Sequence, residues 1–194
     1  MKTQVLQHQD TFNLRIGFVT ASFPHVIEPT TNNVDPKNPK EEYSIDLLIP
    51  KDTDMQHVKR VVEEVCLDEW GPKKRPSFRY EYRKDGDTKT NRDGDPYEGY
   101  PGHWYITAKC DTRRKPQVTD LVGNFLHDED AIVGGDMVHA FVSVYAYDKV
   151  GNAGVGFGLN TVKLVSKTDQ PFGGGVSKST ANESLSEFDQ DVVF

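Results

Sequence analysis

The sequence predicts an all-β domain with one main helix, and two patterns carry this prediction. Apolar residues recur at every second position in several segments, as they do in strands with one buried face. In one segment, within residues 52–72, they recur instead at the spacing of a single helix face. A chain of 194 residues is long enough for one domain with a sizeable core, and we expect one domain plus appendages.

The first two strands are predicted on either side of a long loop. Alternation runs over residues 12–18 and again over 43–49, where Pro50 ends it. Arg15 falls on the polar face of the first strand, so its side chain is expected in solvent. Residues 22–40 contain four prolines and the pair Asn32-Asn33. We therefore predict an irregular loop over this stretch.

The helix has clear start and stop signals. Asp52, Thr53 and Asp54 are N-cap candidates, and Gly71-Pro72 ends the segment. Its apolar residues are spaced to form one buried face: Val58, Val61, Val62, Val65 and Cys66.

The remaining strands are predicted over residues 78–83, 103–110, 137–147 and 155–165. The first two form a long hairpin around a turn-rich insert, and the glycines entering the last predict a bent strand. Small aliphatic residues occupy one face of 137–147, which suits a packed core. The opposite face then presents aromatic rings to solvent. The same alternation turns Tyr105 and Lys109 outward, whereas the row Phe78, Tyr80 and Tyr82 is open to either a core or a surface role.

Positive charge and aromatic rings are interleaved between Lys73 and Lys115. This stretch holds 12 Lys and Arg against 7 Asp and Glu, in a chain of net charge −7, together with 7 of the 20 aromatic residues. Cations and rings side by side suit single-stranded nucleic acid, because phosphates need positive charge and each unpaired base can stack on a ring.

Two sets of contact residues follow from these faces. Bases are expected to stack on Tyr80, Tyr105, Phe141, Tyr145 and Tyr147. Phosphates are expected to meet Arg15, Lys73, Lys74, Arg75, Lys109, Arg113, Arg114 and Lys163.

The C-terminal residues differ in character from the rest. Residues 169–182 form a Gly/Ser-rich stretch that predicts a flexible linker. Residues 183–194 hold four acids and no base, and such a segment cannot pack a core of its own. We therefore expect a disordered acidic tail that serves as an interaction element through Glu183, Glu187, Asp189, Asp191 and Phe194.

Other chemistry finds little support. The sequence lacks zinc-protease, Cys-x-x-Cys, phosphate-loop and serine-elbow motifs, so we predict no enzyme, no catalytic residue, no metal and no cofactor. Its two cysteines are too few for a disulfide framework. No apolar run approaches the roughly 20 residues that cross a bilayer, and the N-terminus does not have the pattern of a signal peptide. A cytoplasmic protein without a membrane partner is expected.

The chain also resembles the OB-fold single-stranded-DNA-binding proteins of tailed bacteriophages. The similarity spans nearly the whole chain, and its most specific part runs from Gly135-Asp136 through Tyr145-Ala146-Tyr147-Asp148 to Gly158-Leu159-Asn160-Thr161-Val162. Further matches are Phe23-Pro24, Glu28-Pro29, Leu48-Ile49-Pro50-Lys51 and Glu69-Trp70-Gly71. Lys115-Pro116-Gln117-Val118-Thr119-Asp120 departs from the family's usual Arg-Pro before Val-Val-Asp.

The resemblance implies an OB-fold, a five-stranded Greek-key β-barrel with long loops, over residues 1–168. It implies sequence-nonspecific binding of single-stranded DNA in phage replication and recombination, in the cytoplasm of the infected bacterial host. The tail would recruit replication proteins such as a polymerase or helicase and compete with DNA, so its removal is expected to extend binding to duplex DNA. A monomer or weak homodimer is expected.

Two other functions remain open. An RNA-binding OB module would share the stacking face, and contacts to the 2′-hydroxyl alone would distinguish it from a DNA binder. A phage structural β-domain would explain the strands and the acidic composition, but not the interleaved cations and rings.

Overall fold

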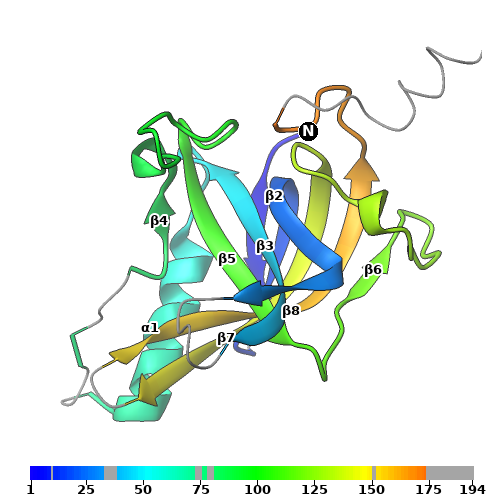
Figure 1. Cartoon of the computed structure of the whole chain (residues 1–194). Coiled ribbons are helices and arrows are strands. Elements are labelled where there is room, and N and C mark those ends of the chain that lie inside the picture. Colours follow the sequence, from blue (N-terminus) through cyan, green and yellow to red (C-terminus); the bar gives the residue numbers. More distant parts are fainter. Residues whose placement is uncertain (10, 33–38, 73–75, 78–80, 150–151, 174–194) are drawn as a thin grey trace, which may run out of the picture.

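Five strands close into a barrel in the computed structural model, which describes residues 1–9, 11–32, 39–72, 76–77, 81–149 and 152–173. They are β2 (Asn13–Asn32), β3 (Lys40–Pro50), β5 (His103–Asp111), β7 (Met137–Lys149) and β8 (Asn152–Ser166). Antiparallel pairing joins β5 to β3, β3 to β2, β2 to β7 and β7 to β8 (Figure 1). A short parallel pairing of β5 with β8 closes the ring. This is the Greek-key order of an OB-fold, and the predicted fold class is confirmed.

Shorter elements lie outside this ring. The strand β1 (Gln4–Gln7) pairs with β2, β4 (Lys84–Asp85) with β5, and β6 (Gln117–Thr119) runs parallel to β8. Two 3₁₀ turns, η1 (Gly86–Thr88) and η2 (Glu129–Ala131), lie in the connections. Over the described residues, no helix has the length and apolarity needed to cross a membrane.

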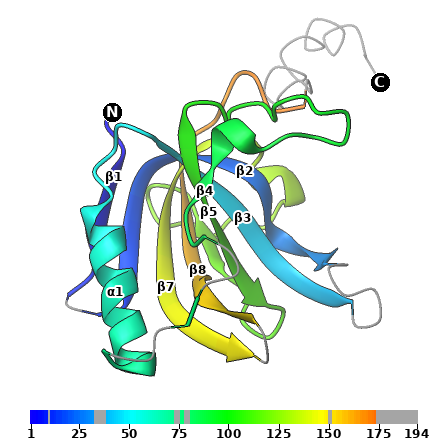
Figure 2. The same cartoon turned by 90° about the vertical axis from the view of Figure 1, so that its left-hand side faces the viewer.

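The helix α1 (Gln56–Trp70) packs along the barrel beside β1 and β7 (Figure 2). All five residues of its predicted apolar face are buried and belong to the barrel core. The Asp54 carboxylate accepts a hydrogen bond from the Gln56 N–H at 2.9 Å, and Gly71 ends the helix with φ of 68°. The helix, its buried face and its end at Gly71 are therefore confirmed. The predicted N-cap is wrong, because Met55 occupies that position and no side chain caps the helix.

The predicted loop over residues 22–40 is wrong for its first half, since β2 continues to Asn32. Register shifts against β3 fall between Ser22 and His25 and between His25 and Thr30. Each shift contains one proline, Pro24 or Pro29, which cannot donate a hydrogen bond to the neighbouring strand. The prolines thus interrupt the pairing locally, as β-bulges do, without ending the strand.

The predicted strand over residues 78–83 is also wrong where the structure describes it, because residues 81–83 are not in a strand. Among the described residues, β5 pairs on this side only with Lys84 and Asp85. Tyr82 packs against the barrel core instead of extending the strand.

The insert between β4 and β5 covers the outer face of β3 and β5 around Leu48 and Tyr105. Its Tyr100 is fully buried and packs with Leu48 and Tyr105 in a second apolar cluster. The Asp46 carboxylate, 6% exposed, accepts hydrogen bonds from the Tyr100 hydroxyl at 2.6 Å, the Thr107 hydroxyl at 2.6 Å and the Lys89 ammonium at 3.2 Å. Burial first, and then the charge of Asp46, raise the pKa of Tyr100 well above its ordinary value.

We predict that Tyr100→Phe lowers the free energy of unfolding by roughly 1.5 kcal/mol, because Asp46 loses one of its three donors while remaining buried. Urea unfolding measures this loss. Tyr97→Phe is the matched control, since the Tyr97 ring packs against the same cluster and surface hydroxyl deletions usually change stability by less than about 0.5 kcal/mol. Equal losses in the two variants would contradict the role given to the Tyr100 hydroxyl.

A buried carboxylate fastens the last described residues to the barrel. Asp136 is fully buried and accepts hydrogen bonds from the backbone N–H groups of Val133 and Thr168 and from the Lys167 ammonium. Farther on, the Phe172 N–H donates a hydrogen bond to the Gly134 carbonyl, and its side chain packs against the cluster that contains Tyr100. The described part of the predicted linker, residues 169–173, therefore lies against the insert.

Candidate nucleic-acid interface

Five of the predicted contact residues line one open groove on the outer face of β8. This groove, of about 570 Å³, is hereafter the β8 groove. The residues come from three parts of the barrel wall: Lys109 from β5, Arg113 and Arg114 from the turn after it, and Phe141 and Tyr145 from β7. Gly158 of β8 also lines the groove.

A second groove adjoins the first, because Phe141 and Thr161 line both. It measures about 350 Å³, and its lining is mainly apolar, with Phe18 and His139 among the residues. Arg15 and Lys163, both predicted phosphate contacts, complete it. We call the two grooves together the track, defined by the predicted residues that line it: Arg15, Lys109, Arg113, Arg114, Phe141, Tyr145 and Lys163.

Strand pairing explains why these residues meet. Arg15 lies opposite Phe141, which in turn lies opposite Thr161 of β8. Lys163 lies opposite His139, and Lys109 pairs with Gly158 across the parallel junction. Directly opposed residues in a sheet point to the same face. The outward positions of β2, β5, β7 and β8 therefore form one continuous surface.

The track is rich in positive charge, part of which is already paired. Arg113 makes two hydrogen bonds to Asp111, at 2.8 and 3.1 Å, and holds the pKa of that carboxyl at about 2. Lys109 pairs with Glu42. In contrast, Arg114 and Lys163 make no ion pair with any described residue. These two cations are therefore available to phosphates, as is Arg15, whose guanidinium donates a long hydrogen bond of 3.5 Å to the Gln7 carbonyl.

The aromatic residues of β7 have the outward placement that the alternation predicted. Val138, Ala140, Val142 and Val144 are buried. On the opposite face Tyr145 is 48% exposed, while Phe141 and Tyr147 are half-buried. The His8 ring packs edge-on against Phe141, with 5.3 Å between centroids. Three rings therefore lie on the outer face of the barrel, two of them inside the track.

Tyr105 is on the outer face of β5, yet it is 7% exposed. Tyr100 packs edge-on against it at 5.1 Å between centroids, and the Lys84 and Lys89 ammonium groups lie 5.3 and 4.8 Å from its ring centroid. Base stacking on Tyr105 stays a prediction, and it would require the insert to move away.

Other predicted contacts fall outside the described residues. These are Tyr80, Lys73, Lys74 and Arg75, together with the tail residues Glu183, Glu187, Asp189, Asp191 and Phe194.

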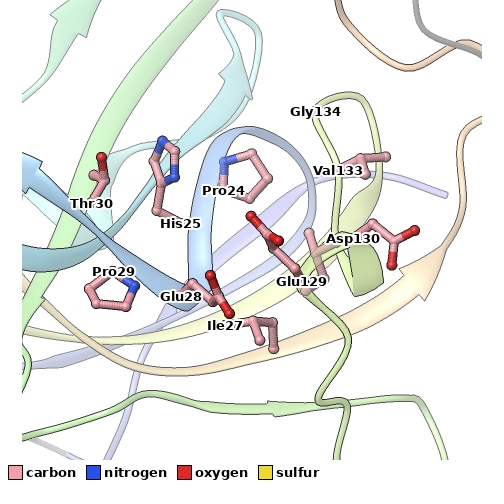
Figure 3. Close-up of a pocket in the computed structure, with 11 residues that line it drawn as sticks. Pro24, His25, Ile27, Glu28, Pro29, Thr30, Glu129, Asp130, Val133 and Gly134 are labelled. Atoms are coloured by element: carbon pink, nitrogen blue, oxygen red, sulfur yellow. The ribbon is translucent and has the colours of Figure 1, made fainter.

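A larger cavity of about 720 Å³ lies between β2 and η2 and differs from the track in charge. Figure 3 shows Glu28 of β2 and Glu129 and Asp130 of η2 among its lining residues. Among the residues that the structure describes, neither Lys nor Arg lines it. Three carboxylates disfavour phosphate by like-charge repulsion, so the track is the better candidate for a nucleic-acid site.

His139 was not among the predicted contacts, although it lines the track. Its Nδ1 accepts a hydrogen bond from the Phe18 N–H at 3.1 Å, and the two rings pack edge-on at 4.5 Å between centroids. Phe18 itself has a φ of 55°, so a backbone bend in β2 aims this N–H at the ring. Burial, followed by the charge of Lys163, lowers the pKa of His139 below its ordinary value of 6.5. The folded protein therefore favours neutral His139.

We predict that the thermal midpoint of unfolding decreases as the pH is lowered from about 7.5 to about 5.5. As the pH is lowered through 6.5, the unfolded chain takes up a proton at His139 more readily than the folded chain does. The free energy of unfolding therefore decreases as the pH decreases in this window. Asp87 and Asp111 have pKa values lowered from 3.8 and titrate below this window. Calorimetry of His139→Gln should show a smaller fall, and an equal fall would contradict the assignment.

Sequence reasoning also missed the glycines of β8. Gly154, Gly156 and Gly158 lie directly opposite Tyr147, Tyr145 and Ser143. The alternating glycines predicted a bent strand, and the structure places them inside β8 on its outer face. The sequence did contain a signal for this pairing: the glycines recur at every second position, as the outward residues of β7 do.

Comparison with known proteins agrees with the barrel fold. The family model described as Enterobacter phage Enc34, ssDNA-binding protein, matches residues 12–193. The solved single-stranded DNA-binding protein from bacteriophage Enc34 in complex with ssDNA superposes with a TM-score of 0.65 at 23% identity, over 89% of this chain and 99% of that one. Gp2.5, a single-stranded DNA binding protein encoded by bacteriophage T7, superposes with a TM-score of 0.51 at 20% identity, over 80% and 92%. No curated protein matches.

Proposed function

Because the chain belongs to the family of the single-stranded-DNA-binding protein of Enterobacter phage Enc34, we propose that it binds single-stranded DNA along the track, without sequence preference. The family is one of DNA-binding proteins and not of enzymes, in agreement with the sequence prediction. The proposed setting is phage DNA replication and recombination in the cytoplasm of the infected bacterial host.

One observation carries the proposed binding site. Seven residues chosen from the sequence for stacking or phosphate contact line two adjoining grooves on one face. The rings lie on β7 and the cations on the neighbouring strands and turn, and neighbouring strands are roughly 4.8 Å apart. A strand of DNA crossing β7, β8 and β5 can place bases on rings while its phosphates meet cations.

Sequence tolerance follows from the same chemistry. Every base has a flat face to stack and every nucleotide carries the same phosphate, so rings and cations bind all sequences alike. Hydrogen bonds to base edges, which carry sequence information, are not required by this arrangement.

Fluorescence anisotropy with end-labelled oligonucleotides of ~20 nucleotides, longer than the site of one OB-fold, tests the proposal. Labelled DNA is preferable to intrinsic tryptophan fluorescence, because neither Trp70 nor Trp104 lines the track. Oligo-dT should bind more tightly than duplex DNA, and its affinity should fall steeply with salt. Tighter binding of the matching RNA would favour an RNA-binding module instead, and salt-insensitive binding would contradict the track.

For the C-terminal segment, we propose that the acidic tail competes with DNA for the track and recruits replication proteins such as a polymerase or helicase. Four carboxylates on a tether stay at high local concentration near a basic surface. Phe194 would supply the apolar anchor for a partner. The protein would act as a monomer or weak homodimer.

Deleting residues 183–194 should tighten binding of oligo-dT at low salt and extend binding to duplex DNA, because the internal competitor is gone. Anisotropy titrations of the full and shortened chains measure the change. A full-length variant with Glu183, Glu187, Asp189 and Asp191 changed to their amides separates charge from length. Unchanged affinity in both variants would contradict competition with DNA, and partner binding would be the only proposed role of the tail.

A further inference from the structure

Three glycines at alternate positions of β8 have no conformational explanation. None of Gly154, Gly156 and Gly158 has a φ in the left-handed region, so each backbone conformation is open to other residues. Glycine weakens a strand, because it loses more conformational freedom on folding and has no side chain to pack. Something other than the backbone must account for glycine at these positions.

The opposing side chains supply the reason. A Cβ atom built on Gly156 would lie 2.6 Å from Cζ and 2.7 Å from Oη of Tyr145. A Cβ on Gly154 would lie 2.6 Å from Oη and 2.8 Å from Cζ of Tyr147. Two tyrosine rings thus lie across the bare backbone of the neighbouring strand, in space that any other residue would fill.

This placement fixes how the rings can be used. Although the end of its ring rests on the strand, Tyr145 is still 48% exposed. A ring held down in this way offers one free face, while a freely rotating ring would have to be ordered on binding at an entropic cost. Gly158, which lines the β8 groove, likewise leaves room for the side chain opposite, because a Cβ there would lie 2.4 Å from Oγ of Ser143.

We propose that Gly156 and Gly154 are positioning residues for single-stranded DNA, which hold Tyr145 and Tyr147 against β8 so that a base can stack on the free face of each ring. This inference rests on the proposed function and deepens it. It adds two residues that touch no DNA themselves and act through the tyrosine opposite. Their effect on affinity must then depend on the presence of that tyrosine.

The test is a double-mutant cycle of Gly156→Ala and Tyr145→Ala, measured as affinity for labelled oligo-dT. Gly156→Ala alone should lower the affinity by roughly 5-fold or more, as the loss of one stacked base does. In the Tyr145→Ala background the same change should have no further effect. Gly154→Ala is the matched control, because it acts through Tyr147 and should still lower the affinity of Tyr145→Ala.

A readout without DNA separates this inference from the proposed function. Burial raises the pKa of Tyr145 in the folded protein, so Gly156→Ala should move it back toward 10.0 in an NMR titration of ring-labelled tyrosine. The thermal midpoint should not fall, since alanine is no worse than glycine in a strand. Wild-type affinity in Gly156→Ala, or an equal loss with and without the Tyr145 ring, would overturn the proposal. If wild-type protein fails to bind DNA, both proposals fall and the titration still tests the packing.

Discussion

Replacing Phe141 and Tyr145 together by alanine should lower the affinity for oligo-dT by ~30-fold or more. Each ring is expected to stack one base, and a stacked base contributes roughly 1 to 3 kcal/mol, so two rings contribute at least about 2 kcal/mol. Both residues line the β8 groove, and both project from the face of β7 opposite the buried valines. The fold should survive, because neither residue belongs to the core.

Anisotropy titrations at low and high salt measure this effect. Stacking does not release counterions, so the dependence of affinity on salt should keep its slope. Phe125→Ala is the matched control for a single ring, because Phe125 is 59% exposed and lies outside the track. A loss in Phe125→Ala as large as that in Phe141→Ala would place the binding surface elsewhere.

The second large effect is expected from charge. Changing both Arg114 and Lys163 to glutamine should lower affinity on the order of 50-fold at ~0.05 M salt and reduce the log–log salt slope by about 1.4, since each phosphate contact on single strands contributes about 0.7. Arg114 lies in one groove of the track and Lys163 in the other. The predicted loss therefore also tests whether one DNA strand crosses both grooves.

Lys59 and Arg92 provide the matched control. Both are exposed, one on α1 and one in the insert, and neither lines the track. Their double change to glutamine alters the net charge by the same amount, so it measures the general effect of charge. Equal losses in the two double variants would mean that overall charge, and not the track, attracts the DNA.

The faces of β7 could be predicted because they depend on local alternation alone. Successive side chains of a strand point to opposite faces, so small aliphatic residues at 138, 140, 142 and 144 assign the rings between them to the outside. The buried positions of the structure agree. The helix face was equally accessible, since its apolar spacing lies within one short segment. In β2 the alternation predicted Phe18 on the buried face and was wrong, because a backbone bend at Phe18 lets its ring line the second groove.

Tyr105 marks the limit of that reasoning. Alternation correctly places it on the outer face of β5, opposite buried Ile106 and Ala108. Only the fold shows that the insert returns over this face, where Tyr100 and Lys89 cover the ring. The face on which a side chain lies is a local property. Whether another segment buries that side chain depends on the path of that segment, which the local pattern does not specify.

The sequence by itself determined the helix and the faces of β7, because each depends on neighbours within a few positions. It also supplied the rings and cations that are proposed to bind single-stranded DNA. The tertiary structure alone decided which of them share a surface. The parallel pairing of Lys109 with Gly158 brings the cations of β5 beside the rings of β7, and such pairing joins segments far apart in the chain. The tertiary structure also explains the β8 glycines, since the absence of a Cβ matters only where a ring from another strand fills the space.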